Sequence, residues 1–93
     1  MASRFAFETD GEKVIVSTVS GDYFRVNREL KAEGMDIGDV TVFEYQHRLA
    51  HRAGQRLGLI DKKLTFNKWA DTVAEFSDEK DDDPGEAEAT PAA

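Results

Sequence analysis

The sequence predicts a small α+β domain, in which an N-terminal β-hairpin packs on about three helices and a disordered acidic C-terminal tail follows. Two alternating apolar segments flank an Asp-Gly pair near the N-terminus, and helix-capping residues precede amphipathic segments in the middle of the chain. The last seventeen residues contain no large apolar side chain. We therefore divide the chain into a folded domain, residues 1–76, and a disordered tail, residues 77–93.

The hairpin is predicted from residues 4–19. Phe5 and Phe7 share one face of the first alternating segment, and Val14 and Val16 share one face of the second. Between the two segments lies Asp10-Gly11, a pair that accepts the positive φ angles of a tight hairpin turn. We expect strands over residues 4–9 and 13–19.

A first helix is expected from Asp22, as N-cap, to about residue 33, with Gly34 ending it in the left-handed conformation. Its apolar face comprises Tyr23, Val26 and Leu30. A third strand over residues 23–26 is the alternative. The linker that follows should place Met35 and Ile37 on the core.

Two more helices are predicted from threonine caps. Thr41 begins a helix to residue 57, and Glu44 three positions later would complete a capping box. Thr65 begins a last helix that we expect to end at residue 76. The buried stripe of the longer helix is Val42, Tyr45, Leu49, Ala53 and Leu57, and that of the last helix is Phe66, Trp69, Val73 and Phe76. An exposed binding surface formed by these four side chains of the last helix is the alternative. Phe24 and Phe43 are also assigned to the core.

The acidity of the chain is concentrated in the predicted tail. Of the net charge of −7, residues 77–93 contribute −6, because they hold seven acidic residues and Lys80. The rest of the chain is nearly neutral. A localised acidic segment of this kind is typical of a solvated arm or a docking segment.

A basic stripe on the helix after Thr41 is the main charged feature of the domain. Arg48, Arg52 and Arg56 recur every four residues and would form either an anion-binding face or the ordinary solvated face of the helix. One hypothesis is that the acidic tail folds back onto this stripe. His47 and His51 share the helix, but they lack a third metal ligand, and we expect both on a solvated face.

No sequence motif indicates an enzyme or a cofactor. The chain has no cysteine, no glycine-rich phosphate loop and no nucleophile paired with a base, and Asp81-Asp82-Asp83 lacks the spacing of a calcium loop. Neither a signal peptide nor a membrane span is expected. A nearly neutral domain with an acidic tail also makes nucleic acid an unexpected partner.

Residues 42–76 resemble the C-terminal half of the tail assembly chaperones of long-tailed phages. The resemblance rests on residue types in order: Leu49-Ala50, Arg52-Ala53, Gly58-Leu59, Thr65-Phe66, Trp69 and Thr72-Val73-Ala74-Glu75. An acidic tail containing Pro and Ala is also in character. The charged segment DYFRVNRELKAEG at residues 22–34 departs from the pattern, as do His47 and His51, where an aromatic residue is often found.

The resemblance implies a chaperone that binds the tape measure protein in the host cytoplasm while tail tube subunits assemble around it. It also implies a homo-oligomer, contact with the tail tube protein, and a longer frameshifted product that diverges near the acidic tail. The expected partner-binding side chains are Tyr45, Leu49, Ala53, Phe66 and Trp69. Two alternatives remain open: a virion component such as a head–tail connector or decoration protein, and a regulator whose acidic tail mimics nucleic acid.

Overall fold

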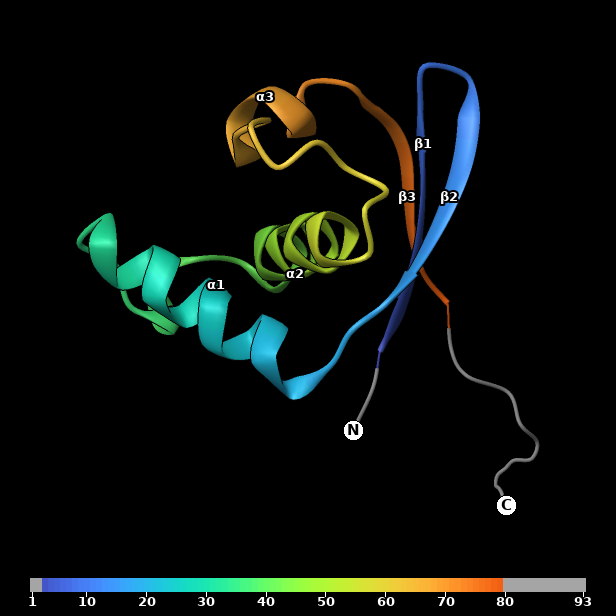
Figure 1. The fold of residues 1–93 in the computed structure, drawn as a ribbon. Helices are drawn as coiled ribbons and strands as arrows, with labels where there is room; N and C mark the ends of the chain where they lie inside the picture. The colour runs from blue at the N-terminus through green and yellow to red at the C-terminus, as the bar shows by residue number, and fades with distance from the viewer. Residues whose placement is uncertain (1–2, 80–93) are drawn as a thin grey trace.

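The computed structural model describes residues 3–79 as one antiparallel sheet with the helices on one of its faces (Figure 1). The elements follow in the order β1 (Arg4–Thr9), β2 (Glu12–Ser17), α1 (Ser20–Ala32), the 3-10 turn η1 (Ile37–Asp39), α2 (Val42–Arg56), α3 (Phe66–Ala70) and β3 (Val73–Glu79). The strand order is β2-β1-β3. The predicted α+β class, with its N-terminal hairpin and three helices, is confirmed.

The hairpin forms as its turn residues require. β1 and β2 pair antiparallel with Thr9 opposite Glu12, and the two residues between them have positive φ angles, 51° at Asp10 and 80° at Gly11. Two successive positive φ angles are the mark of a type I′ turn, whose twist matches that of the strands. β2 ends at Ser17, two residues earlier than predicted.

The prediction of one helix from Thr65 to Phe76 is wrong. α3 is a single short helix that ends at Ala70, and the chain then forms β3, which pairs antiparallel with β1. β3 extends to Glu79, so residues 77–79, which we assigned to the tail, belong to the sheet. The remaining residues of the predicted tail, 80–93, lie outside the described residues.

A bulge in β3 explains why this strand resembles a helix in sequence. Val73 lies opposite Thr9 and Phe76 lies opposite Phe7, although Thr9 and Phe7 are only two residues apart. The extra residue in β3 therefore places Val73 and Phe76 on the same face at a spacing of three, which is a helical spacing. The period of two that marks a strand is absent from the sequence at this point.

α1 begins earlier than predicted, and the alternative of a third strand at residues 23–26 is wrong. Val19 is the N-cap, and Asp22 lies one turn into the helix, where its carboxylate accepts a hydrogen bond of 2.9 Å from the Val19 N–H. At the other end Gly34 has φ 78°, and the Met35 N–H donates to the Leu30 carbonyl at 2.8 Å. The predicted glycine termination is confirmed.

The two predicted threonine caps are confirmed. The Thr41 hydroxyl accepts a hydrogen bond from the Glu44 N–H at 3.0 Å, and the Thr65 hydroxyl accepts one from the Lys68 N–H at 3.4 Å. The Glu44 carboxylate does not close the expected capping box, because it accepts hydrogen bonds from Arg48 instead.

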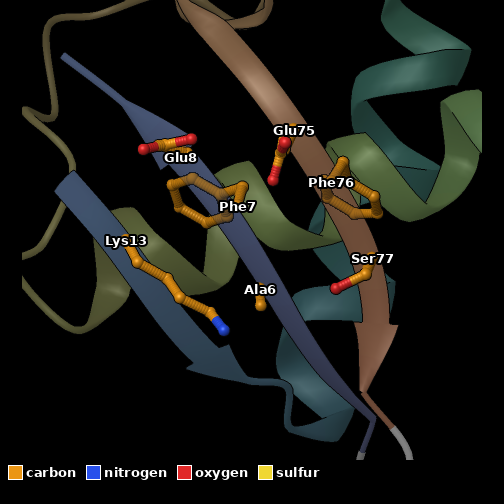
Figure 2. A pocket seen from close by; sticks show the side chains of 7 residues that line it. All are labelled: Ala6, Phe7, Glu8, Lys13, Glu75, Phe76 and Ser77. Atoms are coloured by element: carbon orange, nitrogen blue, oxygen red, sulfur yellow. The ribbon is translucent and has the colours of Figure 1, made fainter. Parts of the chain in front are cut away.

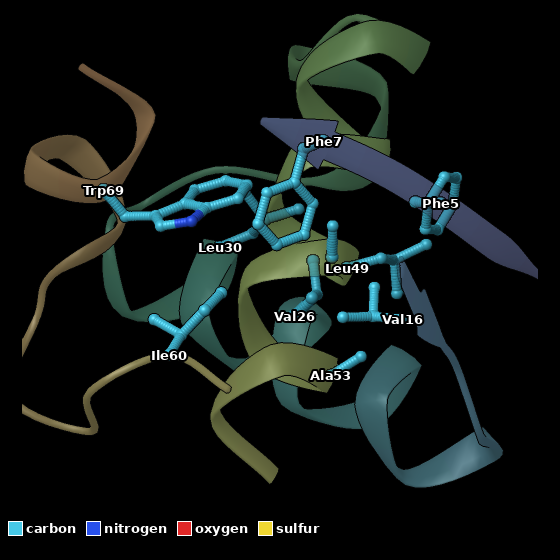
Figure 3. Packing of buried hydrophobic residues seen from close by; sticks show 10 residues of the cluster. Phe5, Phe7, Val16, Val26, Leu30, Leu49, Ala53, Ile60 and Trp69 are labelled. Atoms are coloured by element: carbon cyan, nitrogen blue, oxygen red, sulfur yellow. The ribbon is translucent and has the colours of Figure 1, made fainter. Parts of the chain in front are cut away.

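The hydrophobic core lies between the sheet and the helices (Figure 3). It is formed by the inward faces of β1 and β2, one side of each helix and one residue of the α2–α3 connection, Ile60: Phe5, Phe7, Val16, Val26, Leu30, Leu49, Ala50, Ala53, Ile60 and Trp69. Five side chains that we assigned to the core are instead exposed: Phe24, Ile37, Val42, Phe43 and Leu57. These five exposed side chains lie at helix ends or on outer faces, where no other described element covers them.

Ion pairs of three arginines join α2 to α1. We call them the arginine ladder: Arg48 with Glu33, Arg52 with Glu29, and Arg56 with Asp22. Arg48 forms hydrogen bonds of 3.1 Å to both carboxylate oxygens of Glu33, and it also contacts Glu29 and Glu44. The Nε of Arg52 donates to Glu29 at 2.8 Å.

Asp22 forms the other end of the ladder. Its side chain is 0% exposed, and it receives hydrogen bonds of 3.1 Å from both Nε and Nη2 of Arg56. Arg56 also donates to the Ser17 carbonyl at 2.7 Å, which ties the end of β2 to the two helices.

We predict that Asp22→Ala lowers the free energy of unfolding by about 2–4 kcal/mol, measured by urea denaturation. The substitution leaves the Val19 N–H and the Arg56 guanidinium without their acceptor. Asp39→Ala is the matched control, since Asp39 accepts the same type of hydrogen bond from the Asp36 N–H at an exposed site. An equal loss of unfolding free energy in both variants would show that neither the burial of Asp22 nor its ion pair with Arg56 adds to the stability of the fold.

Candidate functional site

An open surface with an exposed aromatic ring lies between the start of α2, α3 and β3. It is a groove of about 490 Å³, which we call the aromatic groove, and its apolar walls are Phe43, His47, Phe66, Ala70, Val73 and Phe76. Glu44, Asn67 and Glu75 lie among its other lining residues. Phe43 is 64% exposed, an unusual position for so large an apolar side chain.

The exposed ring of Phe43 rests on a stack of aromatic rings that reaches into the core. Its centroid lies 4.2 Å from that of His47, whose ring stacks on Phe76 at 3.8 Å. Phe76 in turn stacks on Phe5 at 5.5 Å. The backbone of α2 therefore presents Phe43 at one end of the stack, where its outer face remains available to a partner.

A hydrogen bond to the backbone also fixes the position of the His47 ring. Its Nδ1 lies 2.8 Å from the Phe43 carbonyl, so this nitrogen carries the proton and donates. The histidine is buried, with only 9% of its surface exposed. The expectation of a solvated face for His47 and His51 is wrong, because α3 and β3 cover this side of α2.

His51 is buried beneath α3 in a neutral form. Its Nε2 donates to the Leu64 carbonyl at 2.8 Å, and its Nδ1 has no hydrogen-bond partner among residues 3–79. Burial lowers the pKa of His51, and the charges of Arg52 and Arg48 also lower it; the Leu64 carbonyl and Glu29 act in the opposite direction without reversing the shift. The ring packs against Trp69 at 5.4 Å.

The five side chains expected to bind a partner are not on one surface. Leu49, Ala53 and Trp69 are buried in the core, where a partner reaches them only if the fold opens. Tyr45 is half-buried on the α1 side of α2, where its hydroxyl donates to Asn27 at 3.2 Å. Phe66 lines the aromatic groove.

Sequence reasoning did not select the other walls of the groove as binding residues, namely Phe43, His47, Ala70, Val73 and Phe76. We assigned Phe43, Val73 and Phe76 to the core, although Val73 and Phe76 also belonged to the alternative of an exposed binding surface on the last helix. The one available signal was the position of Phe43 in the first turn of α2, directly after the Thr41 cap. Side chains in a first turn often lie beyond the elements that cover the middle of a helix.

The basic stripe is engaged within the chain. Arg48 is buried and paired with three carboxylates, and its guanidinium also lies 4.6 Å from the centre of the Phe66 ring. Burial acts to lower the pKa of Arg48, but hydrogen bonds to Glu33, Glu44 and Glu29 and the charge of Glu29 outweigh it and raise the pKa. With Arg52 and Arg56 also bonded to α1, the anions that face this stripe are Asp22, Glu29, Glu33 and Glu44.

The outer face of the sheet carries a second hollow, of about 500 Å³ (Figure 2). It lies over Ala6, and charged side chains from all three strands surround it: Glu8, Lys13 and Glu75. Glu8 lies opposite both Lys13 and Glu75 in the sheet. The lining of this hollow is mainly polar, whereas that of the aromatic groove is mainly apolar.

The described part of the chain offers neither a metal cluster nor a membrane-spanning helix. Residues 3–79 contain no cluster of three or more His, Asp or Glu side chains placed to hold a metal ion. The helices in this range are also too short or too polar to cross a membrane.

Comparisons with family models, with curated proteins and with solved structures returned no match.

We predict that the neutral state of His51 makes the fold less stable in mild acid. Since its pKa is lower in the folded than in the unfolded state, its contribution is complete above the unfolded value of about 6.5 and is lost as the pH falls below that value. Urea denaturation between about pH 7.5 and pH 5.5 should show a falling free energy of unfolding.

The variant His51→Gln tests the assignment. It should be less stable at neutral pH but should show a smaller decline with acid, because the carboxylates and His47 are common to both proteins and cancel in the difference. An unchanged decline in this variant would assign the acid sensitivity to other groups.

Proposed function

We propose that this protein is a tail assembly chaperone of a long-tailed phage, and that it binds the tape measure protein in the host cytoplasm through the aromatic groove. The resemblance of residues 42–76 supports the identity of the client. The exposure of Phe43, held in place by His47 and Phe76, supports the mode of binding and is the observation that carries the proposal.

The energetics favour Phe43 as the anchor. Removing a phenylalanine side chain from water contributes about 1.5–3 kcal/mol, and an aromatic ring surrounded by partly buried apolar side chains is typical of a binding hot spot. Because the stack under Phe43 already fixes its position, little side-chain entropy remains to be lost on binding.

The shape and charge of the groove favour an amphipathic helix as the bound segment. Helices commonly bind by laying an apolar face into a groove between two elements, here between α2 and the α3–β3 segment. Glu44 and Glu75 line the groove among the apolar side chains. Basic residues flanking the apolar face of the client would therefore complement it.

The proposal extends to the assembly of the tail. A chaperone that covers a long client is expected to form homo-oligomers and to contact the tail tube protein. A virion connector or decoration protein remains the alternative, and it is distinguished by mass spectrometry of purified particles. An assembly chaperone should be absent from mature particles.

We predict that Phe43→Ser weakens binding to the tape measure protein at least tenfold, measured by titration calorimetry with the purified client. The loss corresponds to removing the exposed apolar anchor, about 1.4 kcal/mol or more. The fold should be retained, because Phe43 lies outside the core.

Phe24→Ser is the matched control. Phe24 is 69% exposed on α1 and does not line the groove, so this variant should bind as the parent does. A loss in the Phe24 variant with normal binding by the Phe43 variant would place the client on α1. Failure of the parent protein to bind the tape measure protein would contradict the proposed function itself.

A further inference from the structure

The outer side of α1 carries a row of cations that are available to bind an anion. Arg25, Arg28 and Lys31 are exposed and follow one another at a spacing of three residues, which keeps them on one side of the helix. We call them the α1 cationic row. The side chain of Arg25 is 55% exposed and lies 3.8 Å from Asp22, while Arg28 and Lys31 form no ion pair with residues 3–79.

The row lies beside an apolar depression. Phe24, Arg28, Lys31, Met35 and Ile37 are among the residues that line a shallow groove of about 360 Å³ on this side of the molecule. The row therefore differs from the arginine ladder, whose guanidinium groups are bonded to Glu33, Glu29 and Asp22. An anion from outside the described domain can reach the row without breaking any ion pair of the ladder.

The chain itself contains an acidic segment that matches this row. Residues 81–88 include five carboxylates, Asp81, Asp82, Asp83, Glu86 and Glu88, and no basic residue. One residue, Lys80, separates them from β3, which ends at Glu79. We propose that the far end of this acidic segment, Glu86 and Glu88, docks on the first part of the α1 cationic row, at Arg25 and Arg28.

The topology places the start of the segment near α1. Glu79 and Ser17 both lie opposite Arg4 in the sheet, so two strand spacings, about 10 Å, separate them. α1 begins three residues after Ser17, and Figure 1 shows the end of β3 and the start of α1 at the same end of the molecule. Residues 80–88 span up to about 30 Å when extended, which is enough to reach the first half of α1 by this path.

The surrounding charges limit where the segment can bind. Asp22 is buried against Arg56, and Glu29 is turned toward α2, so neither carboxylate opposes the segment directly. Asp36 and Asp39 lie beyond the far end of α1 and would repel it there. Near the aromatic groove Glu44 and Glu75 would also repel it, so the row on α1 is the complementary surface.

The contact is expected to be weak and sensitive to salt. Each ion pair is exposed, but the short connection to β3 gives the segment an effective concentration on the order of millimolar. The contact uses a different surface from the aromatic groove and does not depend on the proposed function.

A spin label tests the proposal on the full-length chain. The sequence has no cysteine, so Ala89→Cys gives a single labelling site just after the acidic segment. At low salt the label should broaden the amide resonances of residues 24–31 of α1. The broadening should be lost at about 1 M salt, where the Debye length is about 3 Å.

Two charge variants decide the site. The broadening should be abolished in a triple variant that combines Arg25→Gln, Arg28→Gln and Lys31→Gln. It should be unchanged in a control that combines Lys62→Gln, Lys63→Gln and Lys68→Gln. Neutralising the segment itself, with Asn for Asp81, Asp82 and Asp83 and Gln for Glu86 and Glu88, should also abolish it, and this variant leaves the described domain untouched. Three results would overturn the proposal. The broadening could be absent at low salt, it could survive neutralisation of the segment, or it could appear at residues 62–68 in place of α1.

Discussion

The arginine ladder between α1 and α2 is the interaction on which the arrangement of the other elements depends. α2 is the central helix, and its three arginines reach α1 through Glu33, Glu29 and Asp22. The same arginines reach two other parts of the fold: Arg56 bonds to the end of β2, and Arg48 lies over Phe66 in α3. One row of guanidinium groups therefore orients α1, α3 and the sheet around a single helix.

The ladder contributes more to specificity than to net stability. Removing two charges from water costs about as much free energy as their attraction returns, so a buried pair is a weak source of stability but is costly to break. Sliding α1 along α2 by one helical turn would move Arg56 away from Asp22 and leave that buried carboxylate without its guanidinium partner. The paired arrangement is therefore strongly preferred over its nearest alternative, even in a domain with a small hydrophobic core.

Sequence reasoning succeeded where structure is determined locally and failed where it depends on distant partners. The Asp10-Gly11 turn and the Thr41 and Thr65 caps involve neighbours in sequence, and each forms as predicted. β3 pairs with a strand about seventy residues earlier, and its bulge gives Val73 and Phe76 a helical spacing. For the same reason only Phe66 of the groove was anticipated as a binding residue: which side of α2 is covered depends on α1, α3 and β3 together.

Two grooves of the described domain differ in charge. The aromatic groove has glutamates among its lining residues, whereas Arg28 and Lys31, which line the groove on α1, form no ion pair with residues 3–79. An acidic segment that continues from β3 is repelled by the first surface and attracted by the second. Its docking on α1 would leave Phe43 exposed on its aromatic stack. The acidic residues would then limit association through α1 while the aromatic groove stays open to a client with basic flanks.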